Sequence, residues 1–224
     1  MTIWLTRSRQ QSETFAKALG RPSIIAPVTR ITYRMPIIEG SYDAVITTSP
    51  HGPVGVTQYH SLPLYTVGEA SADAARQQGF QLAISIAQDA ASLAAMIVVA
   101  HSTPSKFLYL SGAETRINIK KLIESQGHNV TQVITYEAIA ETQLVPELLA
   151  HWRKISAVIF MSVGALKAAQ SLITQDVSHI QAFCISPTVA AAAGALPWKA
   201  IHVSASPKQQ SLIDCINKTI TVSC

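Results

Sequence analysis

The sequence predicts an α/β protein made of two similar parallel-sheet α/β lobes, joined by a two-stranded β hinge and with one lobe inserted into the other. Short β-prone runs alternate with helical patterns along the chain, an alternation typical of βα units around parallel sheets. Several of these units occur twice at a nearly constant offset. Two further β-prone segments belong to no repeat and flank the central units, where the chain can cross between lobes.

Length and composition agree with a folded chain of two lobes. The chain has 224 residues, 48% of them hydrophobic and 13% charged, so it can bury an apolar core, and long disordered stretches are excluded. Two lobes of about 100 residues each fit this length well.

The strands and helices are expected in alternation. The expected strands cover residues 3–6, 44–48, 64–67, 107–110, 157–161 and 182–185, and most are too uniformly apolar to face water on one side. The expected helices cover residues 10–19, 71–78, 116–126, 164–173 and 189–193. Glycines stand where C-cap residues belong, at Gly20, Gly79, Gly127 and Gly194.

The repeats relate units from the two halves of the chain. Residues 42–49 (YDAVITTS) align with 155–162 (ISAVIFMS) at an offset of 113. Residues 66–72 align with 184–190 at an offset of 118, and the same offset superposes 84–87 on 202–205. A looser pair matches 3–6 with 108–111.

The two β-prone segments outside the repeats are residues 30–38 and 133–140. If the chain crosses between lobes there, residues 1–32 and 142–224 form lobe 1 and residues 38–132 form lobe 2. Residues 33–37 and 133–141 then form the β-ladder hinge.

Several functional classes lack support in the sequence. A net charge of +4 without a Lys/Arg block indicates no nucleic-acid partner, and no glycine-rich phosphate-binding motif occurs. Three cysteines without C-x-x-C spacing, and seven histidines without an i, i+4 pair, predict neither disulfides nor a metal site. No signal peptide is recognisable and the longest apolar stretch, around residues 93–100, is too short to span a membrane, so a cytoplasmic protein is expected.

Seven short segments, taken in their order and spacing, carry a resemblance to a known family. They are residues 5–7 (LTR), 43–50 (DAVITTSP), 67–72 (VGEASA), 110–112 (LSG), 133–137 (VITYE), 157–162 (AVIFMS) and 185–190 (ISPTVA). Over essentially the whole chain they resemble the uroporphyrinogen-III synthase family. Two departures stand in the C-terminal half, where Val189 replaces the last Thr of Gly-Pro-x-Thr and Met161-Ser162-Val163 replaces Thr-Ser-Pro.

The resemblance implies two α/β lobes linked by a two-stranded ladder, with the active site in the cleft between them. It also implies a monomer that cyclises and dehydrates the linear tetrapyrrole hydroxymethylbilane to uroporphyrinogen III, with inversion of the last pyrrole ring and no metal or organic cofactor. The alternatives are a two-lobed protein that clamps an anionic ligand without turnover, a paralogue of low activity and, with least support, a nucleotide-binding flavodoxin-like regulator.

The expected substrate-binding residues lie at the turns that follow the strands. At the carboxyl edge of a parallel sheet, helix N-termini expose N–H groups that favour an anion. The expected set is Ser49, Gly68, Ser71, Ser111, Gly112, Ser162, Ser186 and Thr188. Hydroxyl residues at these turns could instead only cap helices.

Three further residues have open roles. The resemblance places Tyr136 in the hinge beside the active site, where a phenol can donate a hydrogen bond to a departing hydroxyl, although it could also be a packed strand aromatic. Arg7 ends the first strand and either meets a carboxylate in bidentate fashion or is solvated. His51 follows the Ser49-Pro50 turn and either lines the cleft or lies at the surface.

Overall fold

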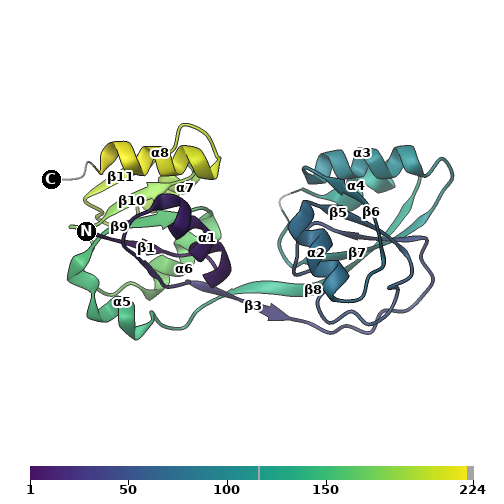
Figure 1. Cartoon of the computed structure of the whole chain (residues 1–224), viewed down its shortest axis with the longest axis horizontal. Helices are drawn as coiled ribbons and strands as arrows, with labels where there is room; N and C mark the ends of the chain where they lie inside the picture. Colours follow the sequence, from purple (N-terminus) through teal and green to yellow (C-terminus); the bar gives the residue numbers. More distant parts are fainter. Residues whose placement is uncertain (116, 221–224) are drawn as a thin grey trace. The chain divides into compact units, whose positions relative to one another are not determined.

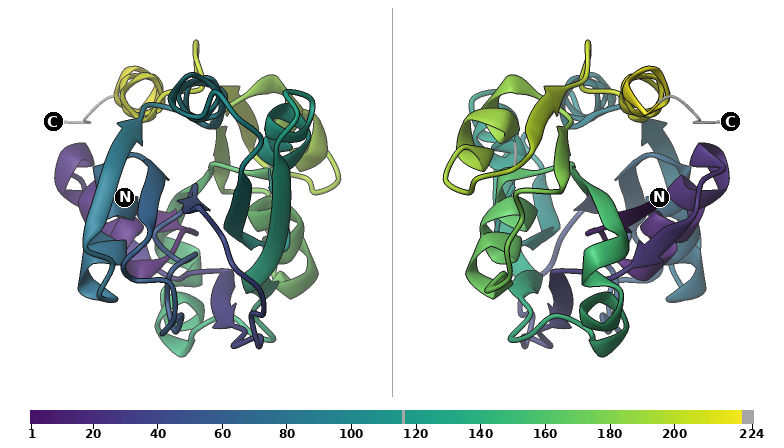
Figure 2. Two further views of the ribbon diagram at one scale, coloured as in Figure 1. Left: turned by 90° about the vertical axis from the view of Figure 1, so that its right-hand side faces the viewer. Right: turned by 90° about the vertical axis from the view of Figure 1, so that its left-hand side faces the viewer.

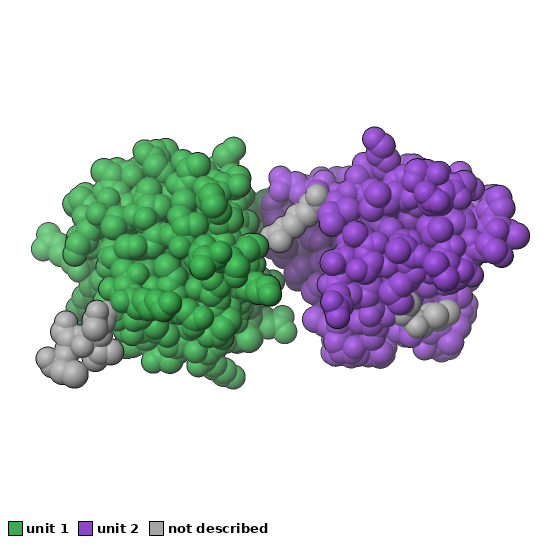
Figure 3. Space-filling model, turned by 90° about the horizontal axis from the view of Figure 1, so that it is seen from above, with its two compact units in different colours: residues 1–30, 139–224 green, residues 31–138 purple. Residues whose placement is uncertain are grey.

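The protein consists of two compact units (Figures 1 and 3). The computed structural model describes residues 1–115 and 117–220. Unit 1 contains residues 1–30 together with 139–224, and unit 2 contains residues 31–138. Unit 2 is therefore inserted into unit 1, as the predicted fold class requires.

Unit 1 is built on a five-stranded parallel sheet of order β11-β10-β9-β1-β2. Its strands are β1 (Thr2–Leu5), β2 (Ser23–Ile25), β9 (Ile155–Phe160), β10 (Gln181–Cys184) and β11 (Ala200–Val203). Its helices are α1 (Arg9–Leu19), α5 (Pro146–Ala150), the 3-10 helix η1 (Trp152–Lys154), α6 (Val163–Leu172), α7 (Pro187–Ala193) and α8 (Gln209–Thr219). Because β1 lies between β2 and β9, the two ends of the sequence share one sheet.

Unit 2 is built on a six-stranded sheet of order β3-β8-β7-β4-β5-β6. Its strands are β3 (Thr29–Tyr33), β4 (Ala44–Thr47), β5 (Pro63–Val67), β6 (Leu82–Ala87), β7 (Lys106–Gly112) and β8 (Asn129–Ala140), and its helices are α2 (Glu69–Gln77), α3 (Ala90–Ala100) and α4 (Ile119–Glu124). Strands β4 to β8 run parallel. Only the edge strand β3, which both units share, is antiparallel to its neighbour, so this sheet is mixed.

The strand orders confirm the internal repeats. The aligned segments occupy equivalent places, with β4 corresponding to β9, β5 to β10, β6 to β11 and β7 to β1. The order also relates β8 to β2, a pair that the sequence comparison does not detect. The two units are thus the same sheet arrangement with a different starting strand.

Each unit has its own hydrophobic core. In unit 1 the indole of Trp4 packs edge-on against Trp152, with ring centroids 5.8 Å apart, and its N–H donates to the carbonyl of Ala26 at 2.8 Å. In unit 2 successive strand residues enter two separate clusters: Phe107 and Tyr109 pack with α3 and α4, whereas Leu108 and Leu110 pack on the opposite face. Alternation along a strand places neighbours on opposite faces, so both faces of this sheet are covered (Figure 2).

Most expected elements are found within one or two residues, and α4 is the main exception. It begins at Ile119 rather than at 116, because the side chain of Asn118 accepts a hydrogen bond from the amide of Lys121 and caps the helix there. The first residue of the expected helix, Arg116, lies outside the described residues. Gly20 ends α1 in the left-handed conformation (φ 65°), which a glycine adopts without strain.

The strands at the two crossings differ from the expected hinge. Strand β3 covers Thr29–Tyr33 rather than 33–37, and β8 starts at Asn129 because its first half belongs to the sheet of unit 2. Pro36, which has no N–H to donate, follows β3 at a short distance and cannot extend the ladder. The unit boundaries fall at 30/31 and 138/139, inside this strand pair.

Two backbone hydrogen bonds fix the register of the ladder. The amide of Arg34 donates to the carbonyl of Thr135 at 2.7 Å, and that of Glu141 donates to the carbonyl of Val28 at 2.9 Å. Both bonds imply one regular antiparallel register, in which Tyr33 stands opposite Tyr136 as a non-hydrogen-bonded pair with side chains on one face. The other face carries two ion pairs, Arg30–Glu141 at 2.8 Å and Arg34–Glu137 at 2.9 Å.

None of the helices within residues 1–115 and 117–220 has both the length and the apolar character needed to cross a bilayer.

Candidate functional site

The predicted site residues lie at or just after the carboxyl ends of the strands in both sheets, except Tyr136, which lies within β8 beside the end of β7. Those of unit 1 are Arg7, Ser162, Ser186 and Thr188, and those of unit 2 are Ser49, Gly68, Ser71, Ser111, Gly112 and Tyr136. Parallel strands end at one edge of their sheet, so each set is gathered at the edge where ligands of open α/β sheets bind.

Tyr136 is placed by an irregularity in strand β8. The pairing of β7 with β8 shifts between Ser111 and Gly112, so that Ser111 pairs with Ile134 and Gly112 pairs with Tyr136. The extra residue is Thr135, whose buried hydroxyl donates to the carbonyl of Gly52 at 2.8 Å. A bulge of this kind redirects the following side chain, and bulges are common beside active sites.

Gly112 is the surface against which the Tyr136 ring lies. A Cβ atom added to Gly112 would lie 2.7 Å from Cζ and 2.9 Å from the hydroxyl oxygen of Tyr136. The two main chains are also joined here by a hydrogen bond, in which the amide of Ala113 donates to the carbonyl of Tyr136 at 3.0 Å. Only glycine leaves room for the phenol in this position.

His51 and Tyr33 complete an aromatic group around Tyr136. The ring centroid of His51 lies 5.3 Å from that of Tyr136 and 6.0 Å from that of Tyr33. The hydroxyl of Tyr33 and Nδ1 of His51 form a hydrogen bond of 2.9 Å. Burial lowers the pKa of His51 below its ordinary value, and burial, followed by the nearby Tyr136, raises the pKa of Tyr33.

A hydrogen bond between two hydroxyl groups lies at the same edge. The hydroxyl of Tyr109, whose side chain is almost fully buried, is 3.0 Å from that of Thr48, which follows β4. Burial raises the pKa of Tyr109, and the nearby Tyr136 acts in the same direction. The rings of Tyr33, His51 and Tyr109 are therefore uncharged at neutral pH.

The serines at the turns are engaged within the chain. Ser162 accepts a hydrogen bond from the amide of Ala165 at 3.1 Å, and Ser186 accepts one from the amide of Val189 at 3.4 Å, so both cap their helices. In unit 2, Ser49 accepts from the amide of His51 at 3.3 Å, and the buried Ser111 accepts from the amide group of Gln132 at 2.9 Å. A hydroxyl that accepts in this way still has its own hydrogen to donate.

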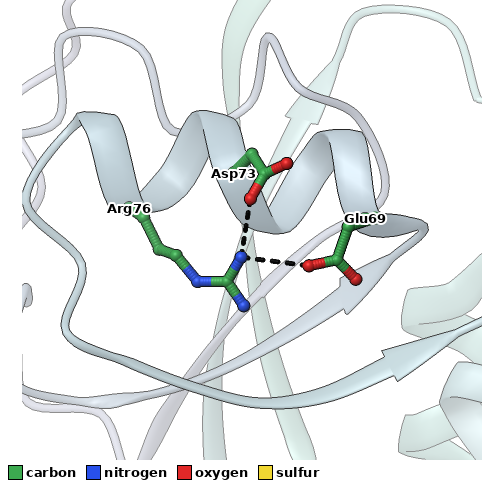
Figure 4. Close-up of polar contacts among 3 residues, drawn as sticks. All are labelled: Glu69, Asp73 and Arg76. Carbon is green, nitrogen blue, oxygen red and sulfur yellow. Dashed lines mark hydrogen bonds and ion pairs between the residues drawn. The ribbon is translucent and has the colours of Figure 1, made fainter.

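The turn before α2 differs from the others in its charge. Gly68 takes a positive φ of 72°, and its N–H already donates to the carbonyl of Ala87, while Ser71 is buried within the first helical turn. Glu69 adds a carboxylate at the start of this helix. Its charge is compensated by Arg76, whose guanidinium lies 3.1 Å from Glu69 and 2.7 Å from Asp73 (Figure 4).

Arg7 lies at the edge of the sheet in unit 1. One of its guanidinium nitrogens approaches the sulfur of Met161 at 3.4 Å, across the ends of β1 and β9. Both residues line a small cavity together with Leu5, Thr6, Ser12, Phe15 and Ile159. Thr188 is exposed in the first turn of α7.

In the part of the chain that the structure describes, no three His, Cys, Asp or Glu side chains gather as a metal site requires.

Sequence reasoning gives His51 two alternatives, the cleft or the surface, and does not name Tyr33 as a candidate. A signal for Tyr33 exists: the triplet Ile-Thr-Tyr occurs at residues 31–33 and again at 134–136, in the two strands that pair as the ladder.

Comparison with known proteins gives one consistent family. The family model for uroporphyrinogen-III synthase HemD (HEM4) matches residues 11–214 of the chain. No curated protein sequence gives a significant match.

Solved structures show the same fold. The uroporphyrinogen-III synthetase of Helicobacter pylori 26695 matches with a TM-score of 0.70 at 16% sequence identity, covering 98% of this chain and 99% of that one. A mutant uroporphyrinogen III synthase from the extremely thermophilic bacterium Thermus thermophilus matches with a TM-score of 0.50 at 11% identity, covering 97% and 98% of the two chains.

The cap at Ser162 can be tested by its effect on stability. We expect Ser162→Ala to lower the free energy of unfolding by about 1 kcal/mol, because the amide of Ala165 loses its acceptor. Ser8→Ala is the matched control: Ser8 begins α1 without a side-chain cap bond, so its loss should stay within about 0.5 kcal/mol. Urea unfolding of both variants measures the difference, and equal losses would contradict a capping role for Ser162.

Proposed function

This chain belongs to the uroporphyrinogen-III synthase family, and we propose that it is a cyclising hydro-lyase that converts hydroxymethylbilane into uroporphyrinogen III with inversion of the terminal pyrrole ring. The observation that carries this proposal is the family match along residues 11–214. The enzyme then acts in tetrapyrrole synthesis. Its cytoplasmic location and monomeric state stay predictions.

The first chemical step is loss of water from the substrate. The C–O bond of the hydroxymethyl group breaks as the electron-rich pyrrole supplies electrons, the pyrrole nitrogen gives up its proton, and the oxygen takes up one proton and leaves as water. The product is an azafulvene, a strong electrophile. In our proposal the phenol of Tyr136 donates a hydrogen bond to the departing oxygen.

The second step decides the product. Attack by the substituted carbon of the terminal ring gives a spiro intermediate that fragments and recloses with that ring inverted, and loss of a proton restores the pyrrole. Attack by the unsubstituted carbon gives the symmetric type I isomer that forms unaided. The main task of the protein is therefore to hold the chain in one folded arrangement, which is catalysis by proximity and orientation.

The surroundings of Tyr136 support its role. Gly112 lies on one side of the ring and His51 lies near it, so the phenol has little freedom to rotate away. The ring groups of Tyr33, His51 and Tyr109 are uncharged at neutral pH, so none of them adds a charge beside the phenol.

Charged side chains alone do not provide enough partners for the substrate carboxylates. The chain has 17 Lys and Arg residues, and Arg30, Arg34, Arg76 and Lys120 already form ion pairs. We assign carboxylate binding to the βα turns, through Ser49, Gly68, Ser71, Ser111, Gly112, Ser162, Ser186 and Thr188, and to Arg7. Because several of these side chains are engaged internally, we expect main-chain N–H groups and the remaining hydroxyl hydrogens to contribute most.

One assay tests the proposal against ligand binding without turnover. The protein is incubated with freshly generated hydroxymethylbilane, and the oxidised products are separated by chromatography into type I and type III isomers. Type III product above the enzyme-free background is expected. Type I alone, with tight substrate binding, would establish a binding protein instead.

Tyr136→Phe removes one hydroxyl and keeps the ring. Because the leaving group departs readily from an electron-rich pyrrole, we expect kcat to fall by the low end of general-acid effects, about ten- to a hundredfold. The remaining enzymatic product should still be type III, since orientation and not the phenol sets the regiochemistry. Single-turnover product analysis measures both, with Tyr42→Phe as control because that hydroxyl donates to the main chain of Glu39. An unchanged kcat would return Tyr136 to a packing role.

Gly112→Ala tests the close approach of the ring. The added methyl group would lie 2.7 Å from Cζ of Tyr136, so the ring must move, and kcat/KM should fall on the order of tenfold to a hundredfold. Gly194→Ala is the control, because its φ of −60° suits alanine and its nearest contact would be 3.6 Å away. Equal activity of the two variants would show that the position of the ring does not matter.

A further inference from the structure

The reaction proposed above leaves the Tyr33–His51 pair without a role. Both residues lie at the functional edge of unit 2, and they come from separate segments: Tyr33 ends β3, and His51 belongs to the turn after β4. Their hydrogen bond of 2.9 Å joins these segments beside the ring of Tyr136, which belongs to β8.

We propose that His51, held by the hydroxyl of Tyr33, is a positioning residue that orients the phenol of Tyr136, and that only neutral His51 does so. The proposal rests on the proposed function for its effect on catalysis, whereas the arrangement of the three rings can be tested without turnover.

The first argument is geometric. The ring of Tyr136 meets Gly112, where an added Cβ would lie within 2.9 Å of two ring carbons and the hydroxyl oxygen. The centroid of the Tyr136 ring lies 5.3 Å from that of the His51 ring. The two rings are tilted by 53°, a geometry in which aromatic pairs attract. Tyr33 stands opposite Tyr136 across the ladder, so all three rings lie on one face.

The second argument is that the turn carrying His51 is fixed. The carbonyl of Gly52 accepts the hydroxyl of Thr135, the bulge residue that precedes Tyr136, at 2.8 Å. A Cβ at Gly52 would collide with the hydroxyl of Thr47 and lie 2.8 Å from the carbonyl of Leu110, so the turn sits directly on the strand ends. His51 is therefore held by the same bulge that aims Tyr136.

The third argument concerns the proton. Burial lowers the pKa of His51 and raises that of Tyr33, so both groups are uncharged at neutral pH. When the neutral imidazole carries its hydrogen on Nε2, the phenol of Tyr33 donates and Nδ1 of His51 accepts. Protonated His51 carries a hydrogen on Nδ1, so this bond can then exist only in the reverse direction, with the imidazolium donating to the phenol oxygen of Tyr33. The phenol of Tyr136 also faces His51, whereas the charged groups nearest along the ladder, Arg34 and Glu137, lie on its opposite face and pair with each other.

The first experiment is an NMR titration of the histidine ring signals in the wild-type protein and in Tyr33→Phe. Removing a donor to the neutral imidazole favours protonation, so the pKa of His51 should rise by about 0.5–1 in the variant, the size expected of one hydrogen bond. The control Tyr42→Phe, which removes the hydroxyl that donates to the carbonyl of Glu39, should leave it unchanged. An unaltered pKa of His51 in Tyr33→Phe would overturn the pairing.

The second experiment measures kcat and KM against pH for the wild type, His51→Gln and His51→Phe. In the wild type, kcat should fall at acid pH with the same apparent pKa that NMR records for His51; this fall is the acid limb of the pH profile. His51→Gln should lower kcat by about three- to tenfold with little change in KM, and should remove this acid limb. His51→Phe keeps an aromatic ring without a titrating nitrogen, so it should also lack the limb and retain more kcat than His51→Gln.

The outcomes separate the two proposals. A wild-type protein that makes no type III product refutes the proposed function, while the titration still decides the ring arrangement. An active wild type whose acid limb persists in His51→Gln overturns the positioning role, as does a variant that keeps the full kcat.

Discussion

Strand β8 is the constraint on which the rest of the structure depends. It runs parallel to β7 on one side and antiparallel to β3 on the other, so its twelve residues belong both to a sheet and to the ladder where the chain passes between units. The change of partner coincides with the bulge at Thr135 and with the end of β7 at Gly112. A side chain at this point of β8 has the main chain of β3 on one side and that of β7 on the other, and Tyr136 occupies this position.

The bulge explains why the residues around Tyr136 are so specific. A strand without it would keep strict alternation, and the face that Tyr136 presents would be set by the sheet core instead of by the ladder. The bulge needs a hydrogen-bonding partner for its extra residue, and the carbonyl of Gly52 supplies it for Thr135. The phenol needs open space beside β7, which Gly112 provides. The position of Tyr136 therefore depends on three segments, and the residues that meet these requirements are small or carry a hydroxyl group: Gly52, Gly112 and Thr135.

The sequence predicted the two-unit architecture because the repeats report on it directly: buried parallel strands need Ala-Val-Ile runs, and the aligned runs occupy equivalent places in both sheets. The ends of β3 and β8 and the bulge were not predictable in this way. A bulge depends on the registers of three strands, and no local pattern around Thr135 encodes them. The capping bonds of Ser162 and Ser186 follow from local sequence, whereas the approach of His51 to Tyr33 joins residues that only the folded sheet brings together.

An uncharged, aromatic edge suits the proposed chemistry better than a cationic one would. The electrophile formed by loss of water gains positive character at the reacting carbon, and the faces of aromatic rings stabilise cations, whereas a nearby Lys or Arg would oppose its formation. A cation at this place would also attract the substrate carboxylates and compete with the arrangement that the cyclisation needs. Tyr33, His51 and Tyr109 are uncharged at neutral pH, so in the proposed function these three side chains add no ionic partner for a carboxylate beside Tyr136. In the proposed function, recognition of the acidic arms is then left to the βα turns and to Arg7.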